Sequence, residues 1–310
     1  MISIIICSIN PERCEKTLEN FSKTIGIEYE VIVFDNRQKG WGLCKTYNYC
    51  AEKAKYQYLC FVHEDVFIDT KDWGKRIVEF VEKIPKCGVV GFAGGLQARK
   101  NFSSWWAGER RVNIRDGYNS RTRVYSRADY RNHAFINPDN EPHSRVLCVD
   151  GLFHFVKKTI WEEVKYDEST FPAFHFYDVD FSLAVSELYS NYALLNFDVF
   201  HDSSGNVNKE YIKWMFAFQE KWNGKLPKSI TAIDGFKNLY AELREAMTVF
   251  VYCKIAGFAM GKYLRQIQRI NSVCFFVLVL VFLPLKVLRT RLTQDRSVRY
   301  FDVLTVDNKG

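Results

Sequence analysis

Short apolar runs alternate with amphipathic segments along the first third of the chain. Residues 2–6 and 58–62 are almost wholly apolar, as expected of strands buried on both faces of a sheet. Between them, Asn10-Pro11-Glu12 has the features of a helix start: a capping side chain, a proline at the first helical position and an acid in the first turn. Repeated strand–helix units of this length build a parallel sheet with right-handed crossovers. The predicted strands are residues 2–6, 30–34, 58–62 and 88–92, and the predicted helices are residues 11–24, 43–55 and 72–84.

The pattern changes in the middle of the chain. Residues 96–145 are rich in arginine and asparagine and show little periodicity, and a stretch of that length inside a compact domain is usually functional or mobile. Pro227 and Gly235 then mark a boundary before a helical tail. We therefore predict an α/β domain over residues 1–225, with a mostly parallel central sheet flanked by helices, and a helical, basic tail over residues 226–310. The later predicted elements are a strand region at 146–156, a helix after Asp178, a strand at 192–199 and a helix at 210–222.

Composition and charge narrow the class of protein. Hydrophobic residues make up 47% of the 310 residues, which is ample material for a buried core. The nine cysteines form no C-x-x-C pair, so we expect reduced, buried thiols in a cytosolic protein without a secretory signal. The net charge of +7 is concentrated at residues 99–131 and 262–300. This asymmetry favours phosphate-rich ligands or an anionic membrane face over nucleic acid as a partner.

The tail contains an uncharged stretch at residues 270–285. Its 16 residues are fewer than the ~20 that cross a ~30 Å hydrocarbon core. Lysine and arginine residues flank the stretch on both sides, which fits a helix lying in the cytoplasmic leaflet of the membrane. A buried core helix or an oligomer helix is the alternative. We therefore expect a cytoplasmic protein that is peripherally attached to the inner face of the membrane.

Polar residues follow three of the predicted strands and would project over one edge of the sheet, where ligands bind in parallel α/β sheets. They are Ser8 and Asn10 after the first strand, Asp35 after the second, and His63, Glu64 and Asp65 after the third. Adjacent acids at a strand end repel each other unless a cation or solvent compensates. Carboxylates of this kind suit Mg²⁺ or Mn²⁺. A solvated turn that carries ordinary acids is the alternative.

Two later residues are further candidates. Asp178 lies among aromatic residues just before a predicted helix, where a carboxylate tends to have a raised pKa and can act as a general base. Capping that helix is the other role open to it. His201 ends a predicted strand and either binds a metal through a ring nitrogen or hydrogen-bonds a turn. Neither a G-x-G-x-x-G motif nor a P-loop is present, which removes two common signatures of nucleotide binding.

The order and spacing of these residues resemble the GT-A glycosyltransferases, in particular the bacterial family-2-like enzymes, over roughly residues 1–225. In that family an acid at the end of the second strand contacts the nucleoside, and here Asp35 ends Val-Ile-Val-Phe-Asp. An asparagine follows on the next helix, here Asn48 in Lys-Thr-Tyr-Asn. The metal-binding D-x-D motif corresponds to His63-Glu64-Asp65.

The resemblance continues in the second half of this region. The family's E-D pair, whose aspartate is the catalytic base, corresponds to Tyr177-Asp178, and its late histidine corresponds to His201. Asp150 and the glycine after it resemble the start of the family's acceptor-side strand. The chain departs from the family pattern at two positions, because residues 63 and 177 are acids in the family and histidine and tyrosine here.

The resemblance implies an inverting glycosyltransferase. Its donor would be a UDP- or GDP-linked sugar, and its acceptor a hydroxyl of a cell-surface glycan or a lipid-linked intermediate. Asp178 would be the base, Asp65 with His201 would hold Mg²⁺ or Mn²⁺, and basic residues within 99–131 would close over the phosphates. The implied contacts to the donor and the cation are Ser8, Asn10, Asp35, Asn48, His63, Glu64 and Asp150.

Two other functions stay open on the sequence. A nucleotidyltransferase of similar build would release pyrophosphate, although Ser8-Ile9-Asn10-Pro11 does not resemble the glycine- and lysine-rich loop of such enzymes. A non-catalytic GT-A-like module that binds a sugar or a partner would fit the altered residues 63 and 177.

Overall fold

The computed structural model describes residues 1–116, 118–119, 124–125, 133–202 and 208–293. The four helices for which both bounds were predicted begin and end within two residues of those positions. The first begins at Pro11, as predicted, because the side chain of Asn10 accepts a hydrogen bond from the backbone N–H of Arg13. The helices are α1 (Pro11–Thr24), α2 (Leu43–Lys53), α3 (Trp73–Lys83), α4 (Lys158–Glu163), α5 (Tyr177–Val185), α6 (Lys209–Lys221), α7 (Gly235–Ile255), α8 (Met260–Ile270) and α9 (Val273–Thr293).

A seven-stranded sheet forms the centre of the described chain. Its order is β12 (His143–Val146), β15 (Ser190–Leu194), β5 (Cys87–Gly91), β14 (Phe153–Lys157), β3 (Tyr58–Val62), β1 (Ile2–Ser8) and β2 (Tyr29–Asp35). Strand β1 runs parallel to both β2 and β3, and β15 runs parallel to β5. Strand β14 lies antiparallel between β3 and β5, and β12 is antiparallel to β15. The α/β class is therefore confirmed, with a mixed sheet in place of a mostly parallel one, because β14 enters the sheet after a long excursion that reverses its direction.

Both faces of this sheet are covered along β1 and β3, which explains the continuous apolar runs of these two strands. Successive residues of β1 face opposite sides: Ile5 packs in the cluster formed with α2, α5 and α6, whereas Ile4 and Ile6 pack with α1 and α3. Phe61 and Cys60 of β3 divide between the two clusters in the same way. A strand buried on both faces has no polar alternation, so the run of apolar residues predicted these strands correctly.

Residues 96–145, which show little periodicity, contribute strands to a second sheet that the sequence did not predict. This sheet comprises β13 (Cys148–Val149), β6 (Ala93–Gly95), β8 (Arg110–Asp116), β16 (Val199–His201), β4 (Val66–Ile68) and β11 (His133–Ile136). Within β8, only Val112 and Ile114 are buried hydrophobic residues, too few to give a clear period. The pairing of β16 with β4 places His201 opposite Val66, and so beside the strand that follows Asp65. Two further short pairs join β9 (Tyr118–Asn119) to β10 (Val124–Tyr125), and β7 (Gln97–Ala98) to β17 (Lys228–Ser229).

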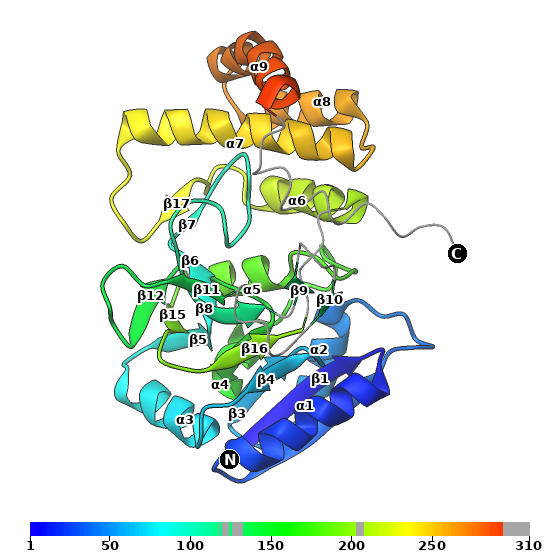
Figure 1. The fold of residues 1–310 in the computed structure, drawn as a ribbon, viewed down its shortest axis with the longest axis vertical. Coiled ribbons are helices and arrows are strands. Elements are labelled where there is room, and N and C mark those ends of the chain that lie inside the picture. The colour runs from blue at the N-terminus through cyan, green and yellow to red at the C-terminus, as the bar shows by residue number, and fades with distance from the viewer. Residues whose placement is uncertain (117, 120–123, 126–132, 203–207, 294–310) are drawn as a thin grey trace.

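The C-terminal helices α7, α8 and α9 lie together at one end of the molecule, beyond α6 and opposite the end that holds α1 and β1 (Figure 1). Buried residues of these helices belong to the same apolar cluster as α2 and α6. A polar contact adds to this packing, since Glu242 of α7 accepts hydrogen bonds from the backbone N–H groups of Lys100 and Asn101. Across the described part of the chain, no helix combines the length and the apolarity that a membrane crossing requires.

Two arginines of the basic stretch 99–131 are bound within the fold. Arg111 forms an ion pair with Asp139, and Arg115 pairs with Asp69 and Asp198. Arg99 donates to Asn238, and Arg110 is half-buried. The other four arginines of the stretch lie outside the described residues: Arg121, Arg123, Arg127 and Arg131.

Candidate active site

The ends of several strands bring the predicted polar residues to one edge of the large sheet. Ser8 and Asp35 are register partners at the ends of β1 and β2. Because β14 is antiparallel to β3, with Phe153 opposite Val62, the start of β14 lies beside the end of β3. Asp150 precedes β14 and therefore reaches the edge from which residues 63–65 leave the sheet.

Three side chains at this edge form a group that could hold a metal ion. His63, Asp65 and His201 each offer one ligand atom, and these atoms lie within 4.8 Å of one another. His201 Nε2 is 3.5 Å from Asp65 Oδ1, and Arg13 of α1 is 3.4 Å from Asp65 Oδ2. The predicted pair of Asp65 and His201 is thus brought together, and the structure adds His63 to it.

The surroundings of this group favour an ionised Asp65 carboxylate and a neutral His63 ring. Burial opposes the ionisation of Asp65, but His201, His63 and Arg13 outweigh burial and hold the pKa of this carboxyl below its ordinary value. Burial lowers the pKa of His63 to about 4, so its ring is neutral at physiological pH. Neutral imidazole and ionised carboxylate are the forms in which these residues bind divalent cations.

A chain of hydrogen bonds leads from His63 towards Asp178. His63 Nε2 lies 2.7 Å from Tyr177 Oη, and Tyr177 Oη donates to the carbonyl oxygen of Gly151 at 2.8 Å. The backbone N–H of Gly151 donates to Asp178 Oδ2 at 3.1 Å. A Cβ atom at position 151 would lie 2.1 Å from Tyr177 Oη and 2.8 Å from Asp178 Cβ. Only glycine therefore allows this approach.

Asp150 and Asp178 are two carboxyl groups whose pKa values are raised. Desolvation is the largest cause for both, and the charge of Asp150 adds to the effect on Asp178. The pKa of Asp178 rises to about 7 and that of Asp150 to about 6. A carboxyl group with a pKa near neutrality can exchange a proton with a substrate at physiological pH.

Glu64 points away from the metal group and holds the loop after β1. Its Oε2 atom accepts hydrogen bonds from Ser8 Oγ at 2.6 Å and from the backbone N–H groups of Ile9 and Asn10 at 3.1 and 3.0 Å. The side chain of Asn10 meanwhile caps α1. Glu64 and Ser8 are buried, and we assign them and Asn10 to the frame of the site.

Asn48 and Asp35 have different surroundings from the residues above. Asn48 is buried, with its amide bonded to the backbone of Tyr166 and to the indole N–H of Trp161. Asp35 is exposed at the sheet edge and forms a bidentate ion pair with Arg37, whose hydrogen bonds lower the pKa of Asp35 to about 2. Of these two residues, Asp35 is the one open to a ligand.

Sequence reasoning missed Arg13 and the roles of Tyr177 and Gly151. Arg13 bridges Asp65 and Asp202, and nothing in its local sequence indicates this, because its partners lie 52 and 189 residues away. Tyr177 could have been noticed from the sequence, since it and His63 are the two departures from the family pattern. The structure shows that the two departures contact each other.

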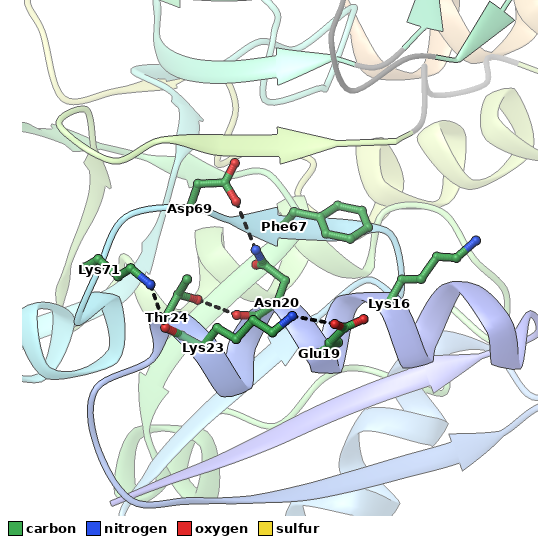
Figure 2. Close-up of a pocket in the computed structure, with 8 residues that line it drawn as sticks. All are labelled: Lys16, Glu19, Asn20, Lys23, Thr24, Phe67, Asp69 and Lys71. Atoms are coloured by element: carbon green, nitrogen blue, oxygen red, sulfur yellow. Dashed lines mark hydrogen bonds and ion pairs between the residues drawn. The ribbon is translucent and has the colours of Figure 1, made fainter.

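A separate groove of about 530 Å³ lies between α1 and β4 (Figure 2). None of its lining residues belongs to the predicted site. Several of its polar groups bond to one another: Asn20 to Asp69, Lys23 to Glu19, and Lys71 to the carbonyl oxygen of Lys23. We assign this groove no ligand.

Comparison with known proteins places the chain in a family. The profile of a glycosyltransferase-like family matches residues 3–213. The chain belongs to this family. The family-level prediction is therefore confirmed, and the match covers every predicted site residue. A search of curated proteins finds no significant match to the sequence.

Solved structures similar to this glycosyltransferase-like chain agree with the fold. A TarS fragment from S. aureus, in complex with UDP-GlcNAc, has a TM-score of 0.51 at 13% identity, with 96% of this chain and 89% of TarS covered. GalNAc-T7, solved with UDP, GalNAc and Mn²⁺, has a TM-score of 0.49 at 12% identity, with 89% of this chain and 56% of GalNAc-T7 covered. The likeness to TarS, together with the family match, confirms the α/β fold of GT-A transferases.

The raised pKa values of the acid pair predict how stability depends on pH. The folded state binds protons on Asp150 and Asp178 more tightly than the unfolded chain, so stability should fall as the pH rises from about 4 to about 7. Asp178→Asn removes a carboxyl group whose ionisation is less favourable in the folded state than in the unfolded chain. We expect this variant to be more stable than the wild type at pH 8, by on the order of 3 kcal/mol, and to differ little from it at pH 4.

Urea unfolding of both proteins between pH 4 and pH 8 measures this difference. Asp35→Asn is the matched control, because the pKa of Asp35 is lowered to about 2 and this group stays ionised throughout the range. If the free energies of unfolding of the wild type and Asp178→Asn changed with pH in parallel, the raised pKa of Asp178 would be contradicted.

Proposed function

We propose that this chain transfers a sugar from a nucleotide-sugar donor to a hydroxyl group of an acceptor, with inversion at the anomeric carbon. One observation carries the proposal: a group suited to a divalent cation and a carboxyl group with a pKa of about 7 lie at the same edge of the sheet, linked through Tyr177 and Gly151. Membership of a glycosyltransferase-like family supports this reaction over other chemistry at such a site.

His63, Asp65 and His201 would hold the cation. Two imidazoles with one carboxylate suit Mn²⁺ better than Mg²⁺, which prefers oxygen ligands. When bound there, a divalent cation would supply positive charge to offset that of the diphosphate leaving group. Arg13, which pairs with Asp65, keeps that carboxylate ionised and oriented.

Asp178 would act as the base towards the acceptor. Its Oδ2 accepts the N–H of Gly151, which orients the carboxyl group. A base is most effective when its pKa lies near the working pH, and the pKa of Asp178 is about 7. Asp150 would contribute by raising that pKa through its charge.

The donor nucleotide would bind beside β1 and β2. Asp35 is exposed there, and its register partner Ser8 belongs to the loop that Glu64 holds. The likeness to a structure that contains UDP-GlcNAc supports UDP-sugars as the first donors to test, with GDP-sugars as the second class. A cell-surface glycan or a lipid-linked intermediate is the acceptor class that the resemblance implies.

A nucleotide-release assay tests this function on the full-length protein. We expect UDP or GDP, and no pyrophosphate, to be released from UDP-GlcNAc, UDP-glucose or GDP-mannose, faster with Mn²⁺ than with Mg²⁺ or EDTA. Asp178→Asn should lower transfer to methyl glycosides by about 10²- to 10⁴-fold, because it removes the proton acceptor. Its KM for the donor should change little.

Asp139→Asn serves as the control, since Asp139 is exposed and pairs with Arg111 on the surface. Release of pyrophosphate would assign the protein to the nucleotidyltransferases. Binding of donor without any release would indicate a non-catalytic module. Either result, or full activity of Asp178→Asn, would overturn the proposal.

We also propose that α9 rests on an anionic membrane leaflet. Its outward face carries apolar side chains at helical spacing, with Val273, Val277 and Val281 between 50% and 75% exposed. The preceding helix α8 exposes Lys262 and Arg265, which complement negative lipid headgroups. The opposite face of α9 is buried in the core through Phe275 and Val279, so the helix would lie on the bilayer rather than cross it.

Charged substitutions on the outward face test this attachment without disturbing the core. We expect Val277→Asp with Val281→Asp to reduce sedimentation with phosphatidylcholine–phosphatidylglycerol vesicles at least about tenfold, because charges oppose burial in lipid. Vesicles of phosphatidylcholine alone should bind the wild type weakly. Leu188→Asp, at an exposed apolar position after α5 (52% exposed), is the control. Equal sedimentation of the double variant and the wild type would refute the membrane contact.

A further inference from the structure

The hydrogen bond between His63 and Tyr177 has one donor and one acceptor, and the number of available hydrogens shows which residue is the donor. A tyrosine hydroxyl has one hydrogen to donate, and a backbone carbonyl oxygen can only accept. Tyr177 Oη lies 2.8 Å from the carbonyl oxygen of Gly151, so its hydrogen is directed there. The hydroxyl oxygen must then accept from His63, whose Nε2 atom is 2.7 Å away.

This direction selects one tautomer of His63. A neutral imidazole has a hydrogen on one ring nitrogen and a lone pair on the other. With the hydrogen on Nε2, the lone pair of His63 is on Nδ1. The second ring nitrogen of a metal-binding histidine commonly donates to such a partner, which sets both the tautomer and the orientation of the ring.

We infer that Tyr177 is a positioning residue that presents the Nδ1 lone pair of His63 to a divalent cation. Gly151 takes part, because its carbonyl oxygen directs the hydroxyl hydrogen of Tyr177 and its missing side chain leaves room for that hydroxyl. The two departures from the family pattern therefore act as one unit. This inference rests on the metal site in the proposed function, and not on sugar transfer itself.

Two measurements on the full-length protein test this role. Nitrogen-15 NMR of the histidine rings, with the His63 signals assigned by their loss in His63→Ala, should show the Nε2–H tautomer in the wild type and a different tautomer population in Tyr177→Phe. Loss of the outer partner of a metal ligand typically weakens binding by 10- to 100-fold. We therefore expect Tyr177→Phe to weaken Mn²⁺ binding, measured by the paramagnetic resonance of free Mn²⁺ with and without UDP, by about tenfold.

A double-mutant cycle separates positioning from a general structural effect. In the His63→Ala background, Tyr177→Phe should leave Mn²⁺ binding unchanged, because its target is gone. Tyr189→Phe, which removes an exposed hydroxyl bonded to Glu163, should bind Mn²⁺ as the wild type does. Additive losses in the cycle, or an Nδ1–H tautomer in the wild type, would overturn the inference. Both readouts are independent of glycosyltransferase activity.

A second feature of the same edge is the exposed ring of Phe174. Its side chain is 55% exposed, whereas Phe171 and Phe176 in the same segment are buried. The segment is anchored, since the N–H of Leu43 donates to the carbonyl oxygen of Ala173 at 3.2 Å. An aromatic ring held in solvent on an anchored segment costs free energy that burial against a ligand would recover.

The surroundings of Phe174 indicate which ligand would cover it. Its ring centroid lies 5.9 Å from that of His63 and 6.3 Å from that of Tyr177, and Asp178 follows on the next helix. The face of an aromatic ring is partially negative and attracts the partially positive C–H groups on the apolar face of a sugar ring. We propose that Phe174 is a stacking surface for a pyranose ring at the proposed transferase site.

Kinetics on the full-length protein, with UDP-GlcNAc as donor and methyl glycosides as acceptors, test this surface. We expect Phe174→Ala to raise the KM of whichever ring stacks there by about tenfold, because the contact to the aromatic face is lost, and Phe174→Trp to retain the wild-type value. A raised donor KM assigns the surface to the donor sugar, and a raised acceptor KM assigns it to the acceptor.

Phe135→Ala, at an exposed phenylalanine on β11 (52% exposed), is the control and should behave as the wild type. Unchanged KM values for both substrates in Phe174→Ala would refute the stacking surface while leaving the transferase assignment intact. Failure of the wild type itself to release nucleotide would instead reject the proposed function.

Discussion

The missing side chain of Gly151 is the constraint on which the candidate site depends. Any Cβ atom at this position would overlap Tyr177 Oη and crowd Asp178. Because β14 is antiparallel to β3, Gly151 lies where the end of β3 meets the start of α5. One glycine therefore allows a possible metal ligand, His63, and a possible base, Asp178, to be joined by two short backbone contacts.

Carboxyl groups at this edge differ in charge state because their neighbours differ. Asp65 is buried, yet Arg13 and two histidines stabilise its ionised form and its pKa is lowered. Asp178 is half-buried, and desolvation together with the charge of another acid, Asp150, raises its pKa. Environments that separate the pKa values of nearby acids allow one to bind a cation while another exchanges a proton. The lowered pKa of Asp65 and the raised pKa of Asp178 are the physical basis for proposing the first as a metal ligand and the second as a base.

Much of the fold and part of the site could be predicted from the sequence. The resemblance to the GT-A glycosyltransferases paired Asp65 with His201, and the structure brings these two side chains together. The helix start predicted at Asn10 is confirmed. The roles of Glu64 and Asn48 could not be foreseen, because their hydrogen-bond partners lie between 54 and 118 residues away in the sequence. The periodicity of hydrophobic residues indicates on which face of a helix or strand a residue lies. It does not indicate which distant backbone groups that residue will contact.

Local patterns in the sequence specify several elements of this protein: the buried strands of the large sheet, which are apolar runs, a capped first helix, and polar residues at the strand ends. These are local properties, set by burial and by backbone hydrogen bonding within a few residues. Only the tertiary structure decided that β14 runs antiparallel, that β16 brings His201 beside Asp65, and that Tyr177 contacts His63. The reason is physical, since these contacts depend on packing between segments more than 90 residues apart, where sums of many small interactions replace any single local signal.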